Sequence, residues 1–330
     1  MKAYLGIDVG SVTTKLALLD ENDELISHVY LLTQGKPIDA VQQGLREIRR
    51  QLPENVSIGG VATTGSARYL AGVIVGADLV KNEITTHAIA ALHYYPGVQT
   101  IIEIGGQDSK LTVVRDGIVI DFAMNTVCAA GTGSFLDHQA LRLDMSIQEL
   151  SQRALTSRTP VRIAGRCTVF AESDMVHKQQ MGHNVEDVLY GLCQALVRNY
   201  LGNVCLGKEI TAPIVFQGGV AFNQAIIRAF REEVDIEVIV PTHHEVMGAI
   251  GAALLVHEDM VASNASSQFK GFDQSEVKYH TSSFECKACP NHCEVAEISQ
   301  NGHALARWGG RCEMWERTPD TELQLSEESK

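Results

Sequence analysis

Apolar and polar positions alternate along the chain in a way that predicts two related β-hairpins. The segments "GIDVGSVTTK", residues 6–15, and "IIEIGGQDSK", residues 101–110, align at an offset of 95 residues. Each joins two apolar strands through a polar, glycine-containing turn, which is typical of a hairpin whose tip exposes N–H groups. The alignment pairs Asp8 with Glu103, Gly10 with Gly105, Thr13 with Asp108, Thr14 with Ser109 and Lys15 with Lys110. One such hairpin is usually a structural turn, but two matching copies indicate a shared function.

Helical patterns occupy much of the remaining chain. Apolar residues recur at i, i+3 and i+4, which predicts helices over 37–52, 83–95, 131–143, 146–155, 184–206 and 243–260. Two other segments, 58–74 and 212–234, read as a strand, a glycine turn and a helix, and 236–241 reads as a strand. This alternation predicts an α/β protein with two related halves.

The character of the sequence changes near residue 261. A polar stretch of small residues predicts a linker over about 259–283. A cysteine-rich module is expected at 284–315, and the acidic tail 316–330 is expected to be disordered.

Composition narrows the possible functions. The 330 residues are 45% hydrophobic and 20% charged, with a formal net charge of −13, which argues against a nucleic-acid or anionic-membrane partner. No apolar run reaches the roughly 18 residues of a membrane span. The opening "MKAYLGIDVG" reads as a strand and not as a signal peptide, so a cytoplasmic location is expected. There, eight cysteines are better explained as thiols or metal ligands than as disulfides.

The hairpin tips have the chemistry of a phosphate site, because backbone N–H groups can bind phosphate oxygens. Asp8 suits Mg²⁺, which retains several waters and takes few carboxylates. In "FQGGVAFN", Gly218 and Gly219 begin a helix, which favours an anion or the close approach of a flat ring. Neither a Walker loop nor a dinucleotide fingerprint is present in the sequence.

Together these motifs resemble a known fold. "GIDVGSVTTK", "EIGGQDSK" and "FQGGVAFN" look like the two phosphate motifs and the adenosine motif shared by sugar kinases, acetate kinase, heat-shock chaperones and actin. The resemblance implies a duplicated actin-like (ribonuclease H-like) ATPase fold, with two halves around a nucleotide cleft. The first half would span 1–97, completed by about 241–258, and the second 98–240.

A narrower resemblance adds "NTVCAAGTGSFLD", "GRCTVFAESD" and "GAIGAAL". With "IGGQDSK", they resemble the activators of 2-hydroxyacyl-CoA dehydratases and the ATPase subunits of benzoyl-CoA reductase, over roughly residues 3–257. The resemblance implies a homodimer with one [4Fe-4S] cluster between its subunits. It also implies ATP-driven electron transfer from a donor such as ferredoxin or flavodoxin to an iron–sulfur dehydratase or reductase.

Roles for individual residues follow from the resemblance. Asp8 would hold Mg²⁺, and Gln107 or Asp108 would orient the attacking water. The alternative is that Gln107 and Asp108 are only the polar residues that a tight turn favours. ATP or ADP would contact Gly10, Ser11, Val12, Thr13, Thr14, Lys15, Gly105, Gly106, Gln107, Gly218, Gly219 and Glu245. The role of Glu245 stays open, because glutamine is expected at its position. The neighbouring His243 and His244 are expected at the surface.

Two cysteines stand in similar small-residue settings. The resemblance implies that Cys128 and Cys167 of each subunit ligate the shared cluster, since a cubane cluster needs about four thiolates. The alternative is that both are small buried hydrophobic residues. Cys193 and Cys205 lie in apolar segments, so core packing is expected for both.

The C-terminal module carries Cys286, Cys289, Cys293 and Cys312. The segment "EVAEISQNGHALARW" predicts a hairpin with an Asn-Gly turn, which would bring Cys312 back to Cys293. Four cytosolic thiols in this spacing favour a metal. Zn²⁺, a second iron–sulfur cluster and no metal stay open.

Two other functions remain possible at this point. A small-molecule kinase of the same fold, or a non-catalytic nucleotide sensor, would also use the hairpins. Neither assigns a role to Cys128 and Cys167.

Overall fold

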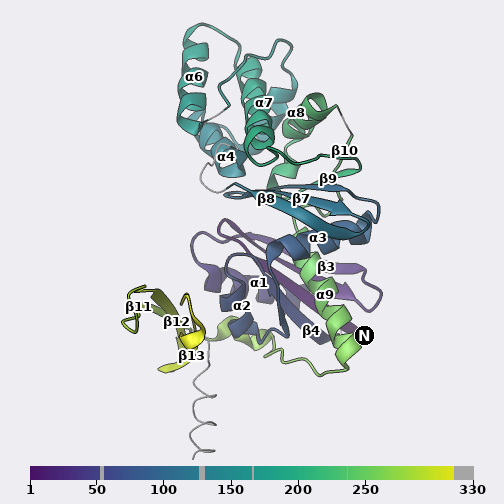
Figure 1. Ribbon diagram of the computed structural model, residues 1–330, viewed down its shortest axis with the longest axis vertical. Coiled ribbons are helices and arrows are strands. Elements are labelled where there is room, and N and C mark those ends of the chain that lie inside the picture. Colours follow the sequence, from purple (N-terminus) through teal and green to yellow (C-terminus); the bar gives the residue numbers. More distant parts are fainter. Residues whose placement is uncertain (53–55, 126–130, 166, 236, 316–330) are drawn as a thin grey trace, which may run out of the picture. The chain divides into compact units, whose positions relative to one another are not determined.

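The computed structural model of the chain describes residues 1–52, 56–125, 131–165, 167–235 and 237–315 (Figure 1). The chain forms two compact units: the first contains 1–10, 14–82 and 252–330, and the second contains 11–13 and 83–251. The second unit therefore begins at residue 83, whereas the sequence suggested a boundary near 97. The difference is α3 (Glu83–Tyr94), which packs in the second unit so closely that a Cβ on Gly251 would lie 1.8 Å from the Thr86 carbonyl oxygen.

The first unit is built on a five-stranded sheet with the order β3-β2-β1-β4-β5. Its strands are β1 (Lys2–Val9), β2 (Thr13–Asp20), β3 (Leu25–Leu32), β4 (Ser57–Thr64) and β5 (Leu79–Val80). β1 pairs antiparallel with β2 and parallel with β4. The parallel pair is joined through a crossover that contains helix α1 (Pro37–Gln51), as such pairs require.

Helices cover both faces of this sheet (Figure 1). On one face, α1 and α2 (Arg68–Val75) bury apolar residues against Leu5, Ile7 and Val9 of β1. On the other, α9 (Met247–Ser263) packs Val256 and Met260 against β1 and β4. Each fully buried Leu, Ile or Val contributes about 1.5–3 kcal/mol, so the two apolar faces of β1 account for much of the sheet's stability.

The second unit repeats this sheet. Its order is β10-β9-β6-β7-β8, in which β6 pairs antiparallel with β7 and parallel with β9. The strands are β6 (Thr100–Ile104), β7 (Ser109–Arg115), β8 (Ile118–Met124), β9 (Ile214–Gln217) and β10 (Val238–Ile239). The predicted duplication is therefore confirmed at the level of strand order and pairing, with β6–β10 matching β1–β5.

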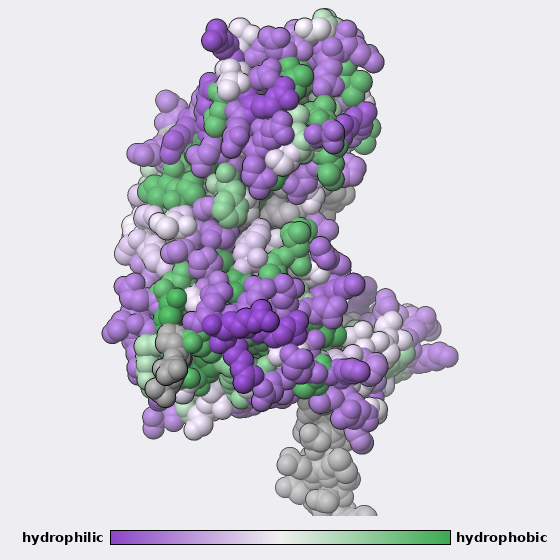
Figure 2. Space-filling view, turned by 180° about the vertical axis from the view of Figure 1, so that it is seen from behind, coloured by the Kyte–Doolittle hydropathy of each residue, from purple (hydrophilic) through white to green (hydrophobic). Residues whose placement is uncertain are grey.

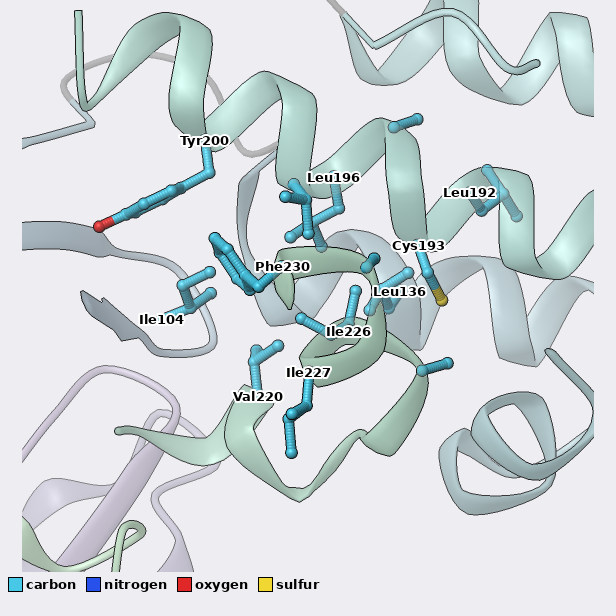
Figure 3. Close-up of a cluster of buried hydrophobic side chains, with 14 of the residues drawn as sticks. Ile104, Leu136, Leu192, Cys193, Leu196, Tyr200, Val220, Ile226, Ile227 and Phe230 are labelled. Atoms are coloured by element: carbon cyan, nitrogen blue, oxygen red, sulfur yellow. The ribbon is translucent and has the colours of Figure 1, made fainter. Parts of the chain in front are cut away.

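The helices of the second unit pack into one apolar core. They are α4 (Gly133–Arg142), α5 (Ile147–Leu155), α6 (Thr168–Gln180), α7 (Val185–Asn203) and α8 (Gln224–Val234), with the short helix η2 (Gly219–Phe222) before α8. In Figure 3, Leu196 and Tyr200 of α7 lie beside Phe230 of α8, and Cys193 belongs to the same cluster. Tyr200 also donates its hydroxyl to the Lys110 carbonyl at 2.8 Å, which fastens α7 to the second hairpin.

The C-terminal region adds a three-stranded antiparallel sheet to the first unit. Its elements are η3 (Phe272–Glu276), β11 (His280–Glu285), β12 (Glu294–Gln300), β13 (His303–Trp308) and η4 (Glu313–Trp315). The predicted hairpin with its Asn-Gly turn is present as β12 and β13, since Gln300 pairs with His303. Ile298 is fully buried in the core of the first unit, so the sheet is packed against that core.

The segment expected to be a linker is also packed on the first unit. Helix α9 continues to Ser263, and the following residues bond to the helices beside the first sheet. The Ser267 hydroxyl and the Gln268 backbone N–H donate to the Asp78 carboxylate at 2.6 Å each, and the Gln42 side chain of α1 donates to the Val277 carbonyl at 2.7 Å. These polar groups serve as docking contacts and not as solvated spacer groups.

The face of the molecule in Figure 2 is mostly hydrophilic, with smaller apolar areas between the polar ones. Within the described parts of the chain, no helix combines the length and the apolar content that a bilayer span requires.

Candidate functional site

The first hairpin holds a carboxylate and an ammonium side by side. Asp8 and Lys15 face each other across β1 and β2, and Lys15 Nζ lies 3.0 Å from Asp8 Oδ2. The Asp8 side chain is 5% exposed and that of Lys15 15%, so the pair is held in place with little exposure to water. A carboxylate of this kind can bind Mg²⁺ through water, and the adjacent ammonium can bind a phosphate oxygen.

The turn of this hairpin is fixed from two sides. Thr33 donates its hydroxyl to the Gly10 carbonyl at 2.9 Å and also bonds the Thr14 hydroxyl. Beside Asp8, Gly65 has a φ of +88°, and a Cβ there would lie 2.5 Å from Asp8 Oδ1 and from the Val9 carbonyl oxygen. Only glycine fits this position, so the β4 turn fixes the Asp8 side chain.

The second hairpin repeats the ion pair in a more acidic setting. Glu103 and Lys110 face each other across β6 and β7, at the positions that correspond to Asp8 and Lys15. Lys110 Nζ lies 3.2 Å from Glu103, 3.3 Å from Glu83 and 3.9 Å from Asp108. Burial alone would lower the pKa of Lys110, but the three carboxylates raise it above its ordinary value.

Glu103 belongs to a buried polar network. His87 Nε2 lies 3.5 Å from Glu103 Oε1, and the Gln217 side-chain nitrogen lies 3.0 Å from His87 Nδ1. Gln217 directly precedes Gly218, so the second hairpin, α3 and the Gly-Gly turn share one set of polar contacts. Such networks fix the positions of the elements that they join.

The loop of the second hairpin is bonded to the chain on both sides of Cys128. Gly133 and Ser134, at the start of α4, donate their N–H groups to the carbonyls of Gly105 and Gly106 at 2.9 and 2.8 Å. Asn125, at the end of β8, accepts from the Ser109 N–H at 2.6 Å. Its amide also donates to the Gln107 carbonyl at 3.2 Å.

The remaining residues predicted at the hairpins have differing surroundings. Gln107 is exposed, and the Asp108 side chain is 44% exposed beside Lys110. Val12 packs on Gly106, where a Cβ would lie 2.7 Å from the valine side chain. Ser11 is exposed and Thr13 is half-buried. Hence residues 105–108 present exposed or half-exposed groups on a loop with a fixed backbone.

The Gly-Gly turn after β9 is a close backbone contact. Gly218 has a φ of +93°, and a Cβ there would lie 2.6 Å from the Ile104 carbonyl oxygen. Its N–H donates to the His244 carbonyl at 2.8 Å, and His244 stacks edge-on against Phe222. Gly219 begins the short helix η2, and α8 then starts at the Asn223 cap.

His244 corrects one expectation from the sequence. It was expected at the surface, but only 8% of it is exposed, because it packs under the Gly-Gly turn. Burial is the main influence on the pKa of His244 and lowers it. Glu245, which follows it, is half-buried and lies 3.8 Å from the imidazole.

Of the two predicted cluster ligands, Cys128 lies outside the described residues. Cys167 is half-exposed and forms the N-cap of α6, in an extended conformation. Because Cys167 caps α6, the positive end of the helix dipole lies at this residue and favours an anionic group there. The next two apolar residues, Val169 and Phe170, are 66% and 68% exposed.

Cys193 and Cys205 are buried, as the sequence predicted. Burial raises the pKa of both thiols to about 12, so both remain protonated near neutral pH. Core packing is their role in the second unit.

The four C-terminal cysteines lie around one end of the C-terminal sheet. Cys286 is buried, Cys293 is half-buried, and Cys289 and Cys312 are exposed. In the described part of the module, no three of the four sulfurs lie within 4.8 Å of one another.

Sequence reasoning missed several residues that hold this region together. They are Thr33, Gly65, Glu83, His87, Asn125 and Gln217. Only Asn125 offered a local signal, because it stands three residues before Cys128 in the quoted "NTVC" motif.

Comparisons with known proteins point to the same family as the sequence motifs. A model of the BadF/BadG/BcrA/BcrD ATPase family matches residues 5–256. The chain is 31% identical over 256 residues to the (R)-2-hydroxyglutaryl-CoA dehydratase activating ATPase of Acidaminococcus fermentans, covering 77% of this chain and 96% of that protein. It is 30% identical over 257 residues to the 2-hydroxyisocaproyl-CoA dehydratase activator of Clostridioides difficile, covering 77% and 95%.

Solved structures give the same result for the fold. The crystal structure of the Acidaminococcus fermentans (R)-2-hydroxyglutaryl-CoA dehydratase component A aligns with a TM-score of 0.71 and 30% identity, covering 79% of this chain and 100% of that one. The Clostridium difficile 2-hydroxyisocaproyl-CoA dehydratase activator with bound ADPNP gives 0.72 and 30%, covering 79% and 97%. The expected duplicated actin-like ATPase fold is confirmed.

Proposed function

Because the chain belongs to the BadF/BadG/BcrA/BcrD ATPase family, we propose that it is an ATP-dependent reductive activator. It uses ATP hydrolysis to drive a low-potential electron to a partner iron–sulfur enzyme. That partner is a 2-hydroxyacyl-CoA dehydratase or a related reductase, since two similar proteins are named as dehydratase activators. An upstream donor such as ferredoxin or flavodoxin supplies the electron.

In this proposal the hairpins bind Mg-ATP. Asp8 holds Mg²⁺ through water, and Lys15 with Ser11, Val12, Thr13 and the glycines at 10, 105 and 106 binds phosphate oxygens. Gln107 or Asp108 orients the attacking water, in line with their exposure at the loop. Gly218, Gly219 and Glu245 take the adenosine. The bound ADPNP of the similar Clostridium difficile activator supports nucleotide binding by this fold.

Cys167 fits a cluster ligand, because its thiol is half-exposed at the positive end of a helix dipole. With Cys128, each subunit would supply two thiolates, so a homodimer would complete the four that a [4Fe-4S] cluster needs. Such a cluster supplies one-electron transfer. The N-terminus of α6 would favour the added negative charge of the reduced state.

One observation carries the coupling between these functions. The loop at residues 105–109 is hydrogen-bonded to Asn125 on one side of Cys128 and to Gly133 and Ser134 on the other. A loop shift on ATP binding or hydrolysis would therefore move both ends of the segment that contains Cys128. Such a shift can bias a two-state arrangement of the cluster-bearing helices. A bias of a few kcal/mol changes a one-electron potential by roughly a hundred millivolts.

Anaerobic purification tests the proposal. The wild-type dimer should be brown and contain about four iron and four sulfide. The variant Cys167→Ala should lose both while still hydrolysing ATP, and Cys205→Ala, at a buried core cysteine, should keep them. A colourless wild-type protein that hydrolyses ATP or phosphorylates a small molecule would instead support the kinase or sensor functions. Retention of the iron by Cys167→Ala would show that the ligand assignment is wrong.

A further inference from the structure

The four cysteines of the C-terminal module lie outside the region that matches the ATPase family, which ends at residue 256. We propose that Cys286, Cys289, Cys293 and Cys312 bind one Zn²⁺, and that this ion fastens the C-terminal sheet to the first unit. Neither the shared cluster nor ATP hydrolysis is needed for this site.

Strand pairing places two of the cysteines opposite each other. β11 and β12 pair Glu285 with Glu294, and the next residue, Cys286, donates its N–H to the Cys293 carbonyl at 2.8 Å. Residues opposed in an antiparallel pair have Cα atoms about 4.5–5.5 Å apart, with side chains on the same face. A tetrahedral ion with Zn–S bonds of about 2.3 Å needs sulfurs about 3.8 Å apart. Cys286 and Cys293, which face each other at the ends of adjacent strands, can therefore bind the same ion.

The loop between these strands adds the third cysteine. Cys289 follows Cys286 by three residues, which is the spacing of a zinc knuckle. The loop turns back at His292, which has a φ of +44°, and its N–H donates to the Cys289 carbonyl at 3.4 Å. The exposed Cys289 thus belongs to a tight turn anchored on both sides.

The chain after β13 returns to the same end of the sheet. Gly309 has a φ of +101°, and a Cβ there would lie 2.7 Å from the Glu294 carbonyl oxygen, beside Cys293. Only glycine permits this approach, and Cys312 follows three residues later. In the described residues no three of the four sulfurs lie within 4.8 Å of one another. Binding of an ion would draw the four sulfurs together.

A buried N–H group provides an independent sign of a thiolate site. The indole Nε1 of Trp315 is buried and has no hydrogen-bond partner among the described residues. Trp315 is held edge-on to Phe284, with ring centroids 5.0 Å apart. Trp315 follows Cys312 by three residues, so this N–H lies close in the chain to a proposed ligand. An N–H group of this kind can donate to a metal-bound thiolate.

The module needs such an ion for stability. Residues 284–315 are too few to bury a sufficient core by themselves, so metal binding would supply much of their folding free energy. The folded sheet then places Ile298, which is fully buried, in the core of the first unit. Loss of the ion would expose Ile298 and release the sheet from that unit.

Metal analysis of the full-length chain tests the site, in a Cys167→Ala background that removes the proposed iron cluster. We expect about one zinc per chain. Cys289→Ser and Cys312→Ser should each lose most of it. Two controls should keep the zinc: Cys312→His, because imidazole is also a zinc ligand, and His292→Ala, which removes a neighbouring side chain that bonds Glu285.

Two further measurements separate metal binding from misfolding. Cobalt substituted into the wild-type chain should show the absorption of tetrahedral cobalt thiolate. Limited proteolysis should cut the Cys→Ser variants, and the chelated protein, within residues 264–315 much faster than the wild type. Equal zinc in wild type and both Cys→Ser variants would overturn the proposal. So would a chain without zinc, or one with iron and sulfide in this background.

Discussion

The two hairpins share one strand register and one pair of charges, yet they use the lysine differently. In the first, Lys15 pairs with Asp8, and both side chains keep a small exposure. In the second, the equivalent Lys110 is buried among Glu83, Glu103 and Asp108. The duplication preserved the strand register and the charge pair, while the surroundings of the lysine differ. We conclude that the first lysine is suited to bind phosphate and the second to hold α3 and the hairpin together.

Replacement of the two lysines should give the largest contrast. Lys110→Met leaves three carboxylates without their buried counter-charge, so the free energy of unfolding should fall by about 3–5 kcal/mol. Lys15→Met removes the charge that faces one buried carboxylate, Asp8, so the loss should lie at the low end of that range, but this variant should strongly weaken ATP binding. Urea denaturation and nucleotide titration measure the two effects. Equal stability losses would contradict the division of roles.

Replacement of the acidic residue should affect ATP turnover more in the first hairpin than in the second. Asp8→Asn removes the proposed Mg²⁺ carboxylate, and turnover should fall by about 100-fold. Glu103→Gln should change turnover less, because Glu83 and Asp108 still face Lys110. Steady-state ATPase assays over a range of Mg²⁺ concentrations compare them. A similar fall in both variants would mean that both hairpins hold the metal.

The glycines beside the hairpins provide a smaller contrast. Gly65→Ala places a Cβ 2.5 Å from Asp8 at a φ of +88°, and should cost about 1–3 kcal/mol and lower Mg²⁺-dependent turnover. Gly106→Ala meets only the Val12 side chain, so the cost should be lower. Thermal unfolding with and without Mg-ATP separates strain from loss of binding. An unaffected Gly65→Ala enzyme would show that the turn is not fixed by this contact.

The side chains that hold the hairpin turns should give the smallest effects on stability. Thr33→Val and Asn125→Ala should each cost about 1 kcal/mol, the usual value for one or two hydrogen bonds. Only Asn125→Ala should also weaken the dependence of electron transfer on ATP, because Asn125 joins the second loop to the segment of Cys128. Acceptor reduction per ATP hydrolysed measures this coupling, with Thr33→Val as the matched control. Unchanged coupling would argue against transmission through Asn125.

Much of the fold could be predicted from local sequence. The hairpin repeat identified the two related sheets, because strand, turn and strand are short-range patterns. Strands β3 and β8 at the sheet edges were missed. In β8 the exposed face carries Ile118, Ile120 and Phe122, so its sequence lacks the alternation of apolar and polar residues that marks a half-covered strand. Helix α6 was missed because it buries only Ala171 and Met175, which gives little periodicity.

The residues that hold the site in place are brought together by long-range contacts, so they could not be predicted from the local sequence. Glu83 and His87 reach the second hairpin from α3, about 20 residues before it in the sequence, and nothing in their local pattern indicated the partner. The docked segment after α9 had the composition of a linker, because polar groups that bond Asp78 look the same in sequence as solvated ones. Its attachment could be found only once the fold had brought these residues together.

The Asp8–Lys15 pair also bears on which ligand the proposed site would select. The Lys15 ammonium lies 3.0 Å from the Asp8 carboxylate, so each offsets the charge of the other. Mg²⁺ alone at Asp8 would add positive charge beside Lys15, and a nucleotide phosphate alone at Lys15 would add negative charge beside Asp8. Only the metal–nucleotide complex replaces both partners together. We therefore expect the hairpin to select the complex over either component, and to hold a metal-free product loosely.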